Sequence, residues 1–425
     1  MNIKLRLIVM NFLEFAVWGA YLTSMGGFLY MEGLADKIWL FFAVQGVVSI
    51  FMPALMGIVA DKWVQAQRVL SICHALAGAF MIGAGVYAMT NAGHIQFAPL
   101  FALYSVSVAF FMPTIAIANS VAYTGLDKAG LDSVKHFPVI RVFGTVGFIC
   151  SMLLVNFVTN GRGEQWQYSH EQFLLSGVLS LVLGVYALTL VRCPCLGKSR
   201  ASKSLAEALG LSAFRLFKER RFVAFFLFSM LLGASLQITN SYANTYIMHF
   251  KDVPEYANTW GAHNANALVS LSQLSETLCI LLIPFCLRKF GIKKVMLVSM
   301  LAWVLRFGLF GAGNTGSGIW MLMLSCIVYG VAFDFFNISG SLYVEYATSD
   351  DIRSSAQGLF MLMVNGLGST LGIWAAGKVV NHYVVFAADP NWSIAWYVFA
   401  GYALVVAILF AICFKEEKFP EVNKR

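Results

Sequence analysis

Long apolar runs dominate this chain and set the narrowest limit on its fold. A helix needs about 20 mostly apolar residues to cross the hydrocarbon core of a bilayer. Runs of that kind follow one another along the whole chain, with short polar breaks near residues 31–37, 61–68 and onward. They fall near residues 5–30, 38–60, 69–89, 97–122, 139–158, 171–191, 221–249, 264–287, 294–313, 318–343, 355–384 and 392–414. The sequence therefore predicts an all-α integral membrane protein with twelve transmembrane helices.

The charge content excludes an ordinary soluble protein. Only 12% of the 425 residues are charged, whereas a soluble domain usually carries about 25%. A net charge of +8 would suggest nucleic acid as a partner of a soluble protein. Here the basic residues lie where membrane topology needs them. We therefore expect the protein to contact a lipid bilayer and not to bind nucleic acid. The first run is too long for a signal peptide and lacks a cleavage site, which predicts a membrane helix.

A basic segment separates the sixth run from the seventh. Residues 192–220 hold two acids and seven basic residues: Arg192, Lys198, Arg200, Lys203, Arg215, Lys218 and Arg220. Cytoplasmic loops are rich in Lys and Arg, so this segment is predicted to be a cytoplasmic linker, with both termini on the same side. The loops assigned to the outside then hold only Lys37, Arg162 and Lys251. The expected parts are a six-helix half at 1–191, the linker at 192–220 and a second six-helix half with a short tail at 221–425.

This layout, together with one motif, resembles the major facilitator superfamily of repeat-built transporters. The loop after the second run reads Gly57-Ile-Val-Ala-Asp61-Lys62, similar to the G-x-x-x-D-[RK] signature of that superfamily, and residues 288–294 occupy the equivalent place in the second half. We expect Asp61 to bond helix ends in one gating state and Gly57 to permit close helix approach. A tight polar turn is the alternative. The resemblance implies a substrate site between the halves, near the middle of the membrane.

Ionisable residues inside apolar runs are costly and are therefore functional candidates. The sequence places five of them at membrane depth: Glu14, Arg141, Glu276, Arg306 and Asp334. Burial raises a carboxyl pKa and a nearby cation lowers it, so Glu276 and Asp334, with Arg141 as counter-charge, are predicted to couple transport to protons. Glu14 shares a helix face with Trp18 and Tyr21 and is a third candidate, with a structural role as the alternative. Arg306 is expected to pair with a carboxylate or to snorkel.

Polar residues also form stripes, because residues three, four or seven apart share a helix face. The stripes are Arg141, Thr145 and Phe148; Gln237, Asn240 and Asn244; Gln273 and Glu276; and Asp334 with Asn337. Amides, carboxylates and an aromatic face suit a polyhydroxylated ligand with a flat ring. The alternative is that these amides hold helices together, as polar residues commonly do in membrane bundles.

No enzyme, metal or cofactor signature emerges. The cysteines mostly lie in apolar runs, where thiols pack as small hydrophobes, and Cys193-Pro-Cys195 lacks the second half of a zinc site. The histidines mostly fall near predicted helix ends, which favours interfacial or solvated positions: His74, His94, His136, His170, His249, His263 and His382. There is no Walker A sequence and no G-x-S-x-G elbow. We therefore expect no enzymatic activity and no resident cofactor.

The chain also resembles, over nearly its full length, the bacterial nucleoside:proton symporters of the major facilitator superfamily. The resembling stretches are FMPALMGIVADKW at 51–63, FPVIRVFGTVGF at 137–148, FSMLLGASLQITN at 228–240, SLSQLSET at 270–277, GVAFDFFNISGS at 330–341 and RSSAQGLF at 353–360. The resemblance implies import of purine and pyrimidine nucleosides, such as adenosine and uridine, by alternating access. The proton gradient across the inner membrane would drive it.

The resemblance also implies a set of site residues. They are Arg141, Thr145, Phe148, Gln237, Asn240, Gln273, Glu276, Phe333, Asp334 and Asn337. On this basis the polar members Gln237, Asn240, Gln273 and Glu276 are assigned to ribose hydroxyls and base edges. Phe148 and Phe333 are assigned to packing on the base, and Arg141 with Asp334 to proton coupling. The family carries Gln or Glu at the position of Glu14, and we expect a monomer.

Two other functions are compatible with the sequence. The first is a carrier of another small polar solute, such as a nucleobase, a sugar or a nucleoside-like antibiotic, and amides that face lipid or other helices would favour it. The second is a membrane sensor without turnover. A sensor needs a surface for signal output, and no soluble domain is apparent in the sequence.

Overall fold

The structure is a computed structural model that describes residues 2–195, 211–349 and 352–414. It divides into two compact units, Met1–Leu205 and Ala206–Arg425. Both consist of helices, and among the described residues extended backbone pairs only at an isolated bridge between Thr159 and Gln165. The all-α prediction is confirmed.

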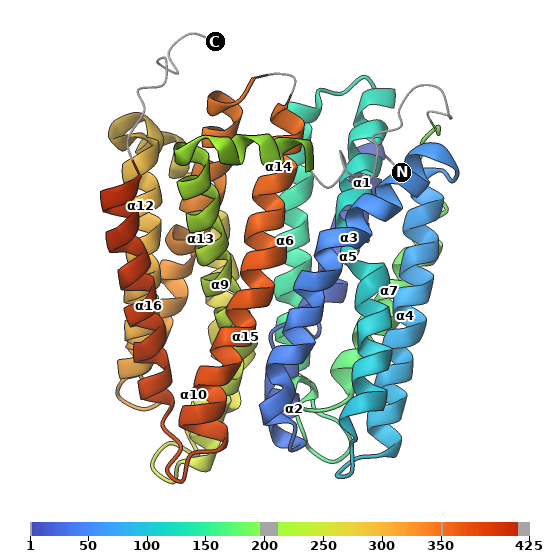
Figure 1. Ribbon diagram of the computed structural model, residues 1–425. Helices are drawn as coiled ribbons and strands as arrows, with labels where there is room; N and C mark the ends of the chain where they lie inside the picture. Colours follow the sequence, from blue (N-terminus) through green and yellow to red (C-terminus); the bar gives the residue numbers. More distant parts are fainter. Residues whose placement is uncertain (1, 196–210, 350–351, 415–425) are drawn as a thin grey trace. The chain divides into compact units, whose positions relative to one another are not determined.

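The first unit runs from blue to green in Figure 1. Its helices are α1 (Ile3–Gly19), α2 (Met25–Met31), α3 (Ile38–Lys62), α4 (Ala66–Thr90), α5 (Phe97–Lys128), α6 (Ser133–Phe157) and α7 (Glu171–Ala187), with short 3-10 turns at Ala35–Lys37 and Trp166–Tyr168. Helix α1 packs against α6 and α7, and α4 packs against α5 and α7. Its apolar core draws on α1, α4, α5, α6 and α7, with fully buried residues such as Leu7, Leu70 and Val121.

The second unit runs from green to red in Figure 1. It begins with the 3-10 helix Leu211–Lys218, in the described part of the predicted linker, whereas 196–210 lie outside the described residues. Its helices are α9 (Arg220–His249), α10 (Trp260–His263), α11 (Ala265–Ile280), α12 (Ile283–Ala312), α13 (Ile319–Ala347), α14 (Arg353–Met361), α15 (Ser369–Val380) and α16 (Trp392–Cys413). Turns of 3-10 helix at Phe250–Asp252 and of π-helix at Leu362–Gly368 and Asn381–Val385 extend them.

The helices have the length and surface of membrane spans. Within the described residues, nine helical segments are long and apolar enough to cross a bilayer. Large apolar side chains remain exposed on them and on α7, among them Val185 and Ile412 with 70% and 72% of their surface accessible. Large exposed apolar surface is unusual for a soluble monomer and fits contact with lipid. Since α1, α7 and α11 have only 16 or 17 residues, the count of twelve crossings stays a prediction.

Two predicted boundaries are wrong in instructive ways. The run at 5–30 is not one helix, because α1 ends at Gly19 and α2 begins at Met25. The Ser24 hydroxyl hydrogen-bonds Gln172 Oε1 at 3.0 Å, which ties this break to α7. The predicted loop at 288–294 is helical on both sides of Gly291, which has φ 77°. Glycine adopts that left-handed conformation without steric cost, so the chain turns there within one residue.

The helix predicted at 139–158, the fifth apolar run, begins earlier than predicted. It corresponds to α6, which starts at Ser133, not near 139, and contains Pro138. Pro138 is the sixth residue of α6, beyond the first four residues whose N–H groups lack partners within the helix, so it removes one backbone hydrogen bond and the helix continues past it. Arg141 therefore lies in the third turn of α6, not at the start of the helix.

Glycines join the helices of the first unit into two tight pairs. A Cβ on Gly147 of α6 would lie 2.1 Å from the carbonyl oxygen of Phe12 on α1. A Cβ on Gly78 of α4 would lie 2.7 Å from the carbonyl oxygen of Gly177 on α7. Real Cβ atoms do not approach so closely, so these backbones touch only because the residues are glycine. We refer to the two assemblies below as the α1/α6 pair and the α4/α7 pair.

Candidate functional site

In the second unit, the polar residues of α11 and α13 meet around one tyrosine. Tyr329 of α13 is buried, and its phenol makes a hydrogen bond with Gln273. The same phenol lies within electrostatic range of the carboxyl groups of Glu276 and Asp334. The Tyr329 ring stacks on Phe333 with centroids 5.8 Å apart and planes 14° apart. Four of the predicted site residues therefore share one environment, and Tyr329 is at its centre.

The remaining polar residue of α13 offers an open hydrogen-bonding position. Asn337 lies one turn after Phe333 and Asp334 and is half-buried. Its Oδ1 is buried and accepts no hydrogen bond from the described residues. Buried polar atoms are nearly always satisfied by protein, water or ligand. Asn337 is therefore a good candidate for a contact to a bound molecule.

The amide side chains of α9 have two different roles: one contacts another helix, and two stay candidates for ligand binding. Gln237 is buried and Asn240 is half-buried. Asn244, one turn further, donates from Nδ2 to Asn266 Oδ1 on α11 at 2.9 Å. Asn244 thus holds two helices together, the alternative considered for these amides, whereas Gln237 and Asn240 stay candidates for a ligand.

Arg306 does not do what the sequence predicts. Its side chain is fully buried in α12 and donates to the carbonyl oxygen of Ser325 at 2.5 Å and to the Ser272 hydroxyl at 3.5 Å. The guanidinium carbon lies 5.1 Å from the ring centroid of Phe310 and 4.8 Å from that of Tyr329, both cation–π distances. None of these partners is a carboxylate, and the side chain does not reach a surface. The expectation of a carboxylate pair or a snorkelling arginine is wrong.

In the first unit, the predicted site residues of α6 lie against α1. The guanidinium carbon of Arg141 lies 3.9 Å from the centroid of the Phe15 ring. Phe148 is buried and meets Trp18 edge to face, with centroids 6.2 Å apart. Thr145, between them on the same face, is half-buried. The α6 stripe therefore lies beside α1, and each end of it contacts an aromatic residue of α1.

Glu14 is fully buried and has two hydrogen-bond partners from other helices. Its Oε2 lies 2.8 Å from Nε2 of His74 on α4, and Thr114 of α5 donates to its Oε1 at 2.6 Å. On the other side of the ring, His74 Nδ1 lies 2.9 Å from the Ser180 hydroxyl of α7. Four helices therefore meet at this carboxyl–imidazole contact.

The prediction of an interfacial or solvated position is therefore wrong for His74. Because α4 begins at Ala66, not near residue 69, His74 lies in the third turn, with none of its surface exposed. The available signal was its position inside the apolar run 69–89, of which it is the sixth residue. Tyr329 was missed as well, although it stands four residues before Phe333, on the same helix face.

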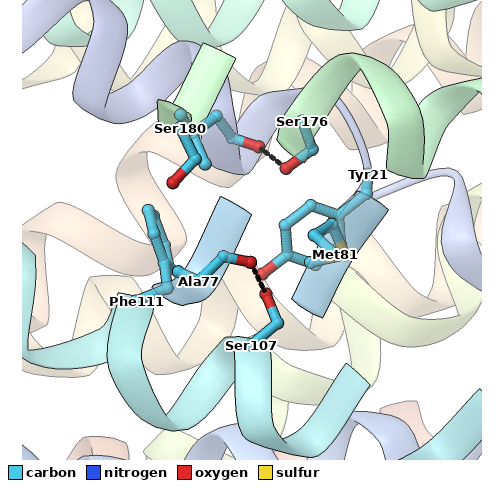
Figure 2. A pocket seen from close by; sticks show the side chains of 8 residues that line it. Tyr21, Ala77, Met81, Ser107, Phe111, Ser176 and Ser180 are labelled. Carbon is cyan, nitrogen blue, oxygen red and sulfur yellow. Dashed lines mark hydrogen bonds between the residues drawn. The ribbon is translucent and has the colours of Figure 1, made fainter. Parts of the chain in front are cut away.

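The helices of the first unit leave a small hollow (Figure 2), and two of its lining residues, Phe111 and Ser180, contact the His74 ring. Eight side chains line it: Val17, Tyr21, Ala77, Met81, Ser107, Phe111, Ser176 and Ser180. Its serine hydroxyls donate to backbone carbonyls of neighbouring helices, Ser107 to Ala77 at 2.7 Å and Ser176 to Val17 at 2.8 Å. The hollow has no room for the centre of a water molecule. It therefore does not supply water to the carboxyl–imidazole contact.

The predicted gating motif lies at the end of α3. An added Cβ on Gly57 would meet no described atom within 4 Å. A close helix approach at Gly57 therefore stays a prediction. Asp61 and Lys62 form the last helical turn, and the side chain of Asp61 is outside the part that the structure describes.

No metal centre is apparent among the described residues, where no group of three or more His, Cys, Asp or Glu side chains is placed to hold an ion. All eight cysteines are free thiols: Cys73, Cys150, Cys193, Cys195, Cys279, Cys286, Cys326 and Cys413. Cys193 is buried, and its backbone N–H donates to Gln67 Oε1 at 2.8 Å. The CPC segment is therefore packed against α4.

Comparison with known proteins gives a consistent result. A family model described as nucleoside H+ symporter matches residues 1–419. The chain is 42% identical over 418 residues to the nucleoside permease NupG of Escherichia coli K12, covering 98% of this chain and 96% of that protein. It is 44% identical to the xanthosine permease of the same organism, covering 100% and 99%. A crystal structure of a mutant of the nucleoside transporter NupG matches with a TM-score of 0.90 and 41% identity, covering 97% of this chain and 100% of that one.

Proposed function

The chain belongs to the nucleoside H+ symporter family, and we infer from this that it imports nucleosides together with protons across the bacterial inner membrane. It is a multi-pass transporter and not an enzyme. Relatives named for nucleosides and for xanthosine support purine nucleosides among its substrates. Uridine and adenosine are the substrates with which to begin.

The proposed architecture is the major facilitator fold, with six crossings in 1–191, six in 221–425 and a basic linker between them. Each predicted apolar run overlaps helices of the structure, although the runs 5–30 and 264–287 are each divided between two of them, and this overlap supports the count. We place the linker and both termini in the cytoplasm because Lys and Arg gather there. A single chain contains both halves, so we propose a monomer.

The nucleoside-binding residues proposed in the second unit are Gln237, Asn240, Gln273, Glu276, Phe333, Asp334 and Asn337. The observation that carries this proposal is the cluster around Tyr329, where a stacked aromatic pair adjoins an amide and two carboxyl groups. Aromatic faces bind a flat base, and amide and carboxylate oxygens accept hydrogen bonds from ribose hydroxyls. Both chemistries that a nucleoside requires are therefore present on adjacent helices.

The first unit would contribute Arg141, Thr145 and Phe148. Phe148 offers an aromatic edge for the base, and Thr145 a hydroxyl. The position of Arg141 over the Phe15 ring holds its cation beside α1. We propose that ligand binding engages residues of both units.

Proton coupling is proposed to reside in Asp334 and Glu276, with Arg141 as counter-charge and Glu14 as a further candidate. A carboxyl group inside a protein changes its proton affinity when a cation approaches or leaves. Asp334 is buried and Glu276 is half-buried, so both have the low-dielectric surroundings that this mechanism needs. Asp61 and Lys62 are proposed to stabilise one gating state.

Two alternatives deserve a test. A nucleobase, a sugar or a nucleoside-like antibiotic could use the same amides, and a non-transporting sensor could use the same fold. Uptake of radiolabelled uridine and adenosine into proteoliposomes, with and without an inward proton gradient, decides among them. Accumulation that a protonophore abolishes establishes symport. Entry of neither nucleoside would overturn the substrate assignment and lead to a screen of bases and sugars.

A further inference from the structure

The Glu14–His74 contact joins the two glycine-packed assemblies of the first unit. Glu14 belongs to the α1/α6 pair and His74 to the α4/α7 pair. Each pair holds together through backbone contacts that glycine alone permits. The side-chain contact between the pairs is different in kind, because a carboxyl group and an imidazole meet there and one proton can lie between them.

The hydrogen bonds around His74 locate one proton on the line between the two groups. The Ser180 hydroxyl has a single hydrogen, and both the carbonyl oxygen and Nδ1 of His74 lie 2.9 Å from its oxygen. When the carbonyl oxygen receives this hydrogen, the hydroxyl oxygen accepts from Nδ1–H of the ring. With Nδ1 protonated, the 2.8 Å distance from Nε2 to Glu14 Oε2 requires a proton between them, supplied by either group. Without it, a ring lone pair would face a carboxylate oxygen.

The surroundings favour one bound proton. Both side chains are fully buried, and burial disfavours net charge. One shared proton makes the pair neutral overall. Other ionisable side chains facing it, among the described residues, are Cys73 on α4, within electrostatic range of Glu14, and Arg141 on α6, over the neighbouring Phe15 ring. Helices α5 and α7 present the hydroxyls of Thr114 and Ser180.

Contacts lead from this pair to the proposed nucleoside-binding residues of the same unit. Trp18, one turn after Glu14, packs against Phe148 on one side and Phe111 on the other, with centroids 6.2 and 6.0 Å apart. Phe111 in turn meets the His74 ring edge to face at 6.0 Å. A ligand that displaces Phe148 therefore acts on α1 and on the surroundings of His74 together.

Resting on the proposed symport function, we propose that Glu14 and His74 form a proton-dependent lock between the α1/α6 and α4/α7 pairs, which holds one proton when closed and releases it when the pairs separate during transport. While Nδ1 keeps its proton, loss of the shared proton places the Nε2 lone pair against an ionised carboxylate, which disfavours the contact. Both side chains are fully buried, so proton exchange with solvent requires that the contact opens. Thr114 and Ser180 are positioning residues that orient the two groups.

The test compares Glu14→Gln and His74→Gln with the control Ser107→Ala in proteoliposomes. The first two remove the exchangeable proton, whereas the control removes a buried hydroxyl that bonds the Ala77 carbonyl oxygen instead of Glu14 or His74. We expect Glu14→Gln and His74→Gln to lower gradient-driven uridine accumulation about tenfold and to shift the pH midpoint of uridine counterflow by about one unit. The control should keep the wild-type midpoint. Wild-type accumulation and midpoint in both Gln variants would overturn the lock and leave the proposed function intact.

A second measurement does not depend on the stability of any variant. Unsubstituted protein labelled with ¹⁵N in its histidine rings is titrated from about pH 5 to about pH 9, with and without uridine. His74 is recognised as the ring signal most protected from solvent exchange. We expect its Nε2 signal to change between protonated and unprotonated positions across that range and uridine to move the transition. An unchanged ring in both titrations would overturn the lock, even if the protein carried a solute other than uridine.

Discussion

Gly147→Ala tests whether backbone contact between α1 and α6 holds the proposed binding residues in place. The added Cβ would lie 2.1 Å from the Phe12 carbonyl oxygen, 2.8 Å from its carbonyl carbon and 3.0 Å from its Cα. Backbone atoms of a helix do not rotate away, so the two helices must separate by roughly 1 Å in an interior packed as densely as a crystal. Overpacking of this kind costs about 3 kcal/mol.

The assay is thermal unfolding of the purified protein in detergent at one scan rate. For a unit of this size, about 3 kcal/mol corresponds to a fall in Tm of roughly 6–12 °C. The matched control is Gly83→Ala on α4, where an added Cβ meets only Leu103 Cδ2 at an ordinary 3.5 Å. Alanine is favoured over glycine inside a helix by about 0.5–1 kcal/mol, so the control should unfold at the same or a higher temperature. Equal Tm values for the two variants would refute the close-contact argument.

Four further predictions concern the proposed site of the second unit and the Cys193 thiol. Asp334→Asn should abolish gradient-driven accumulation while uridine exchange continues; full pH dependence of uptake in this variant would place coupling elsewhere. Glu276→Gln should lower uridine uptake about tenfold or more, since it removes a charged hydrogen-bond acceptor, and near-normal accumulation in vesicles contradicts its role. Tyr329→Phe keeps the ring stack and removes the hydroxyl, so the KM for uridine should rise about threefold to tenfold, and an unchanged KM argues against this residue. Burial raises the pKa of the Cys193 thiol, so it forms thiolate only at higher pH: in a variant retaining this cysteine alone, maleimide labelling should be half-maximal above about pH 8.5, the value for a free thiol.

The sequence predicts the helices well because the length and apolar character of a run are local properties. Boundaries failed where a single residue changes the geometry, as at Gly291, where a left-handed φ lets helical turns continue on both sides of a predicted loop. The site residues of α11 and of α13 were predicted because helical spacing places those of each helix on one face of that helix. The packing of the two faces against each other depends on tertiary contacts. Tyr329 joins the two helices through such contacts, which residue spacing does not encode.

Partners distant in sequence account for the larger errors. Glu14 was singled out as an acid inside an apolar run, but its partner His74 is 60 residues away on α4. No local pattern relates them. Asn244 belonged to a regular stripe, yet Asn266 takes up its amide, so spacing alone did not distinguish a ligand contact from an interhelical one.

Arg306 in the second unit and the Glu14–His74 pair in the first are buried ionisable sites of different chemistry, and this difference decides which of them is proposed for proton coupling. In the second unit, Arg306 rests on the Ser325 carbonyl and the Tyr329 ring, and a guanidinium keeps its proton in any protein environment. Its charge is therefore a permanent part of that fold. In the first unit, a carboxyl group and an imidazole meet at 2.8 Å, and the proposed lock requires one proton between them. A fixed cation can orient the groups around Tyr329, but only a group that releases its proton can link transport to the proton gradient. Neutral variants of the acids near Tyr329 and of the Glu14–His74 pair should therefore uncouple transport. A neutral variant of Arg306 should not.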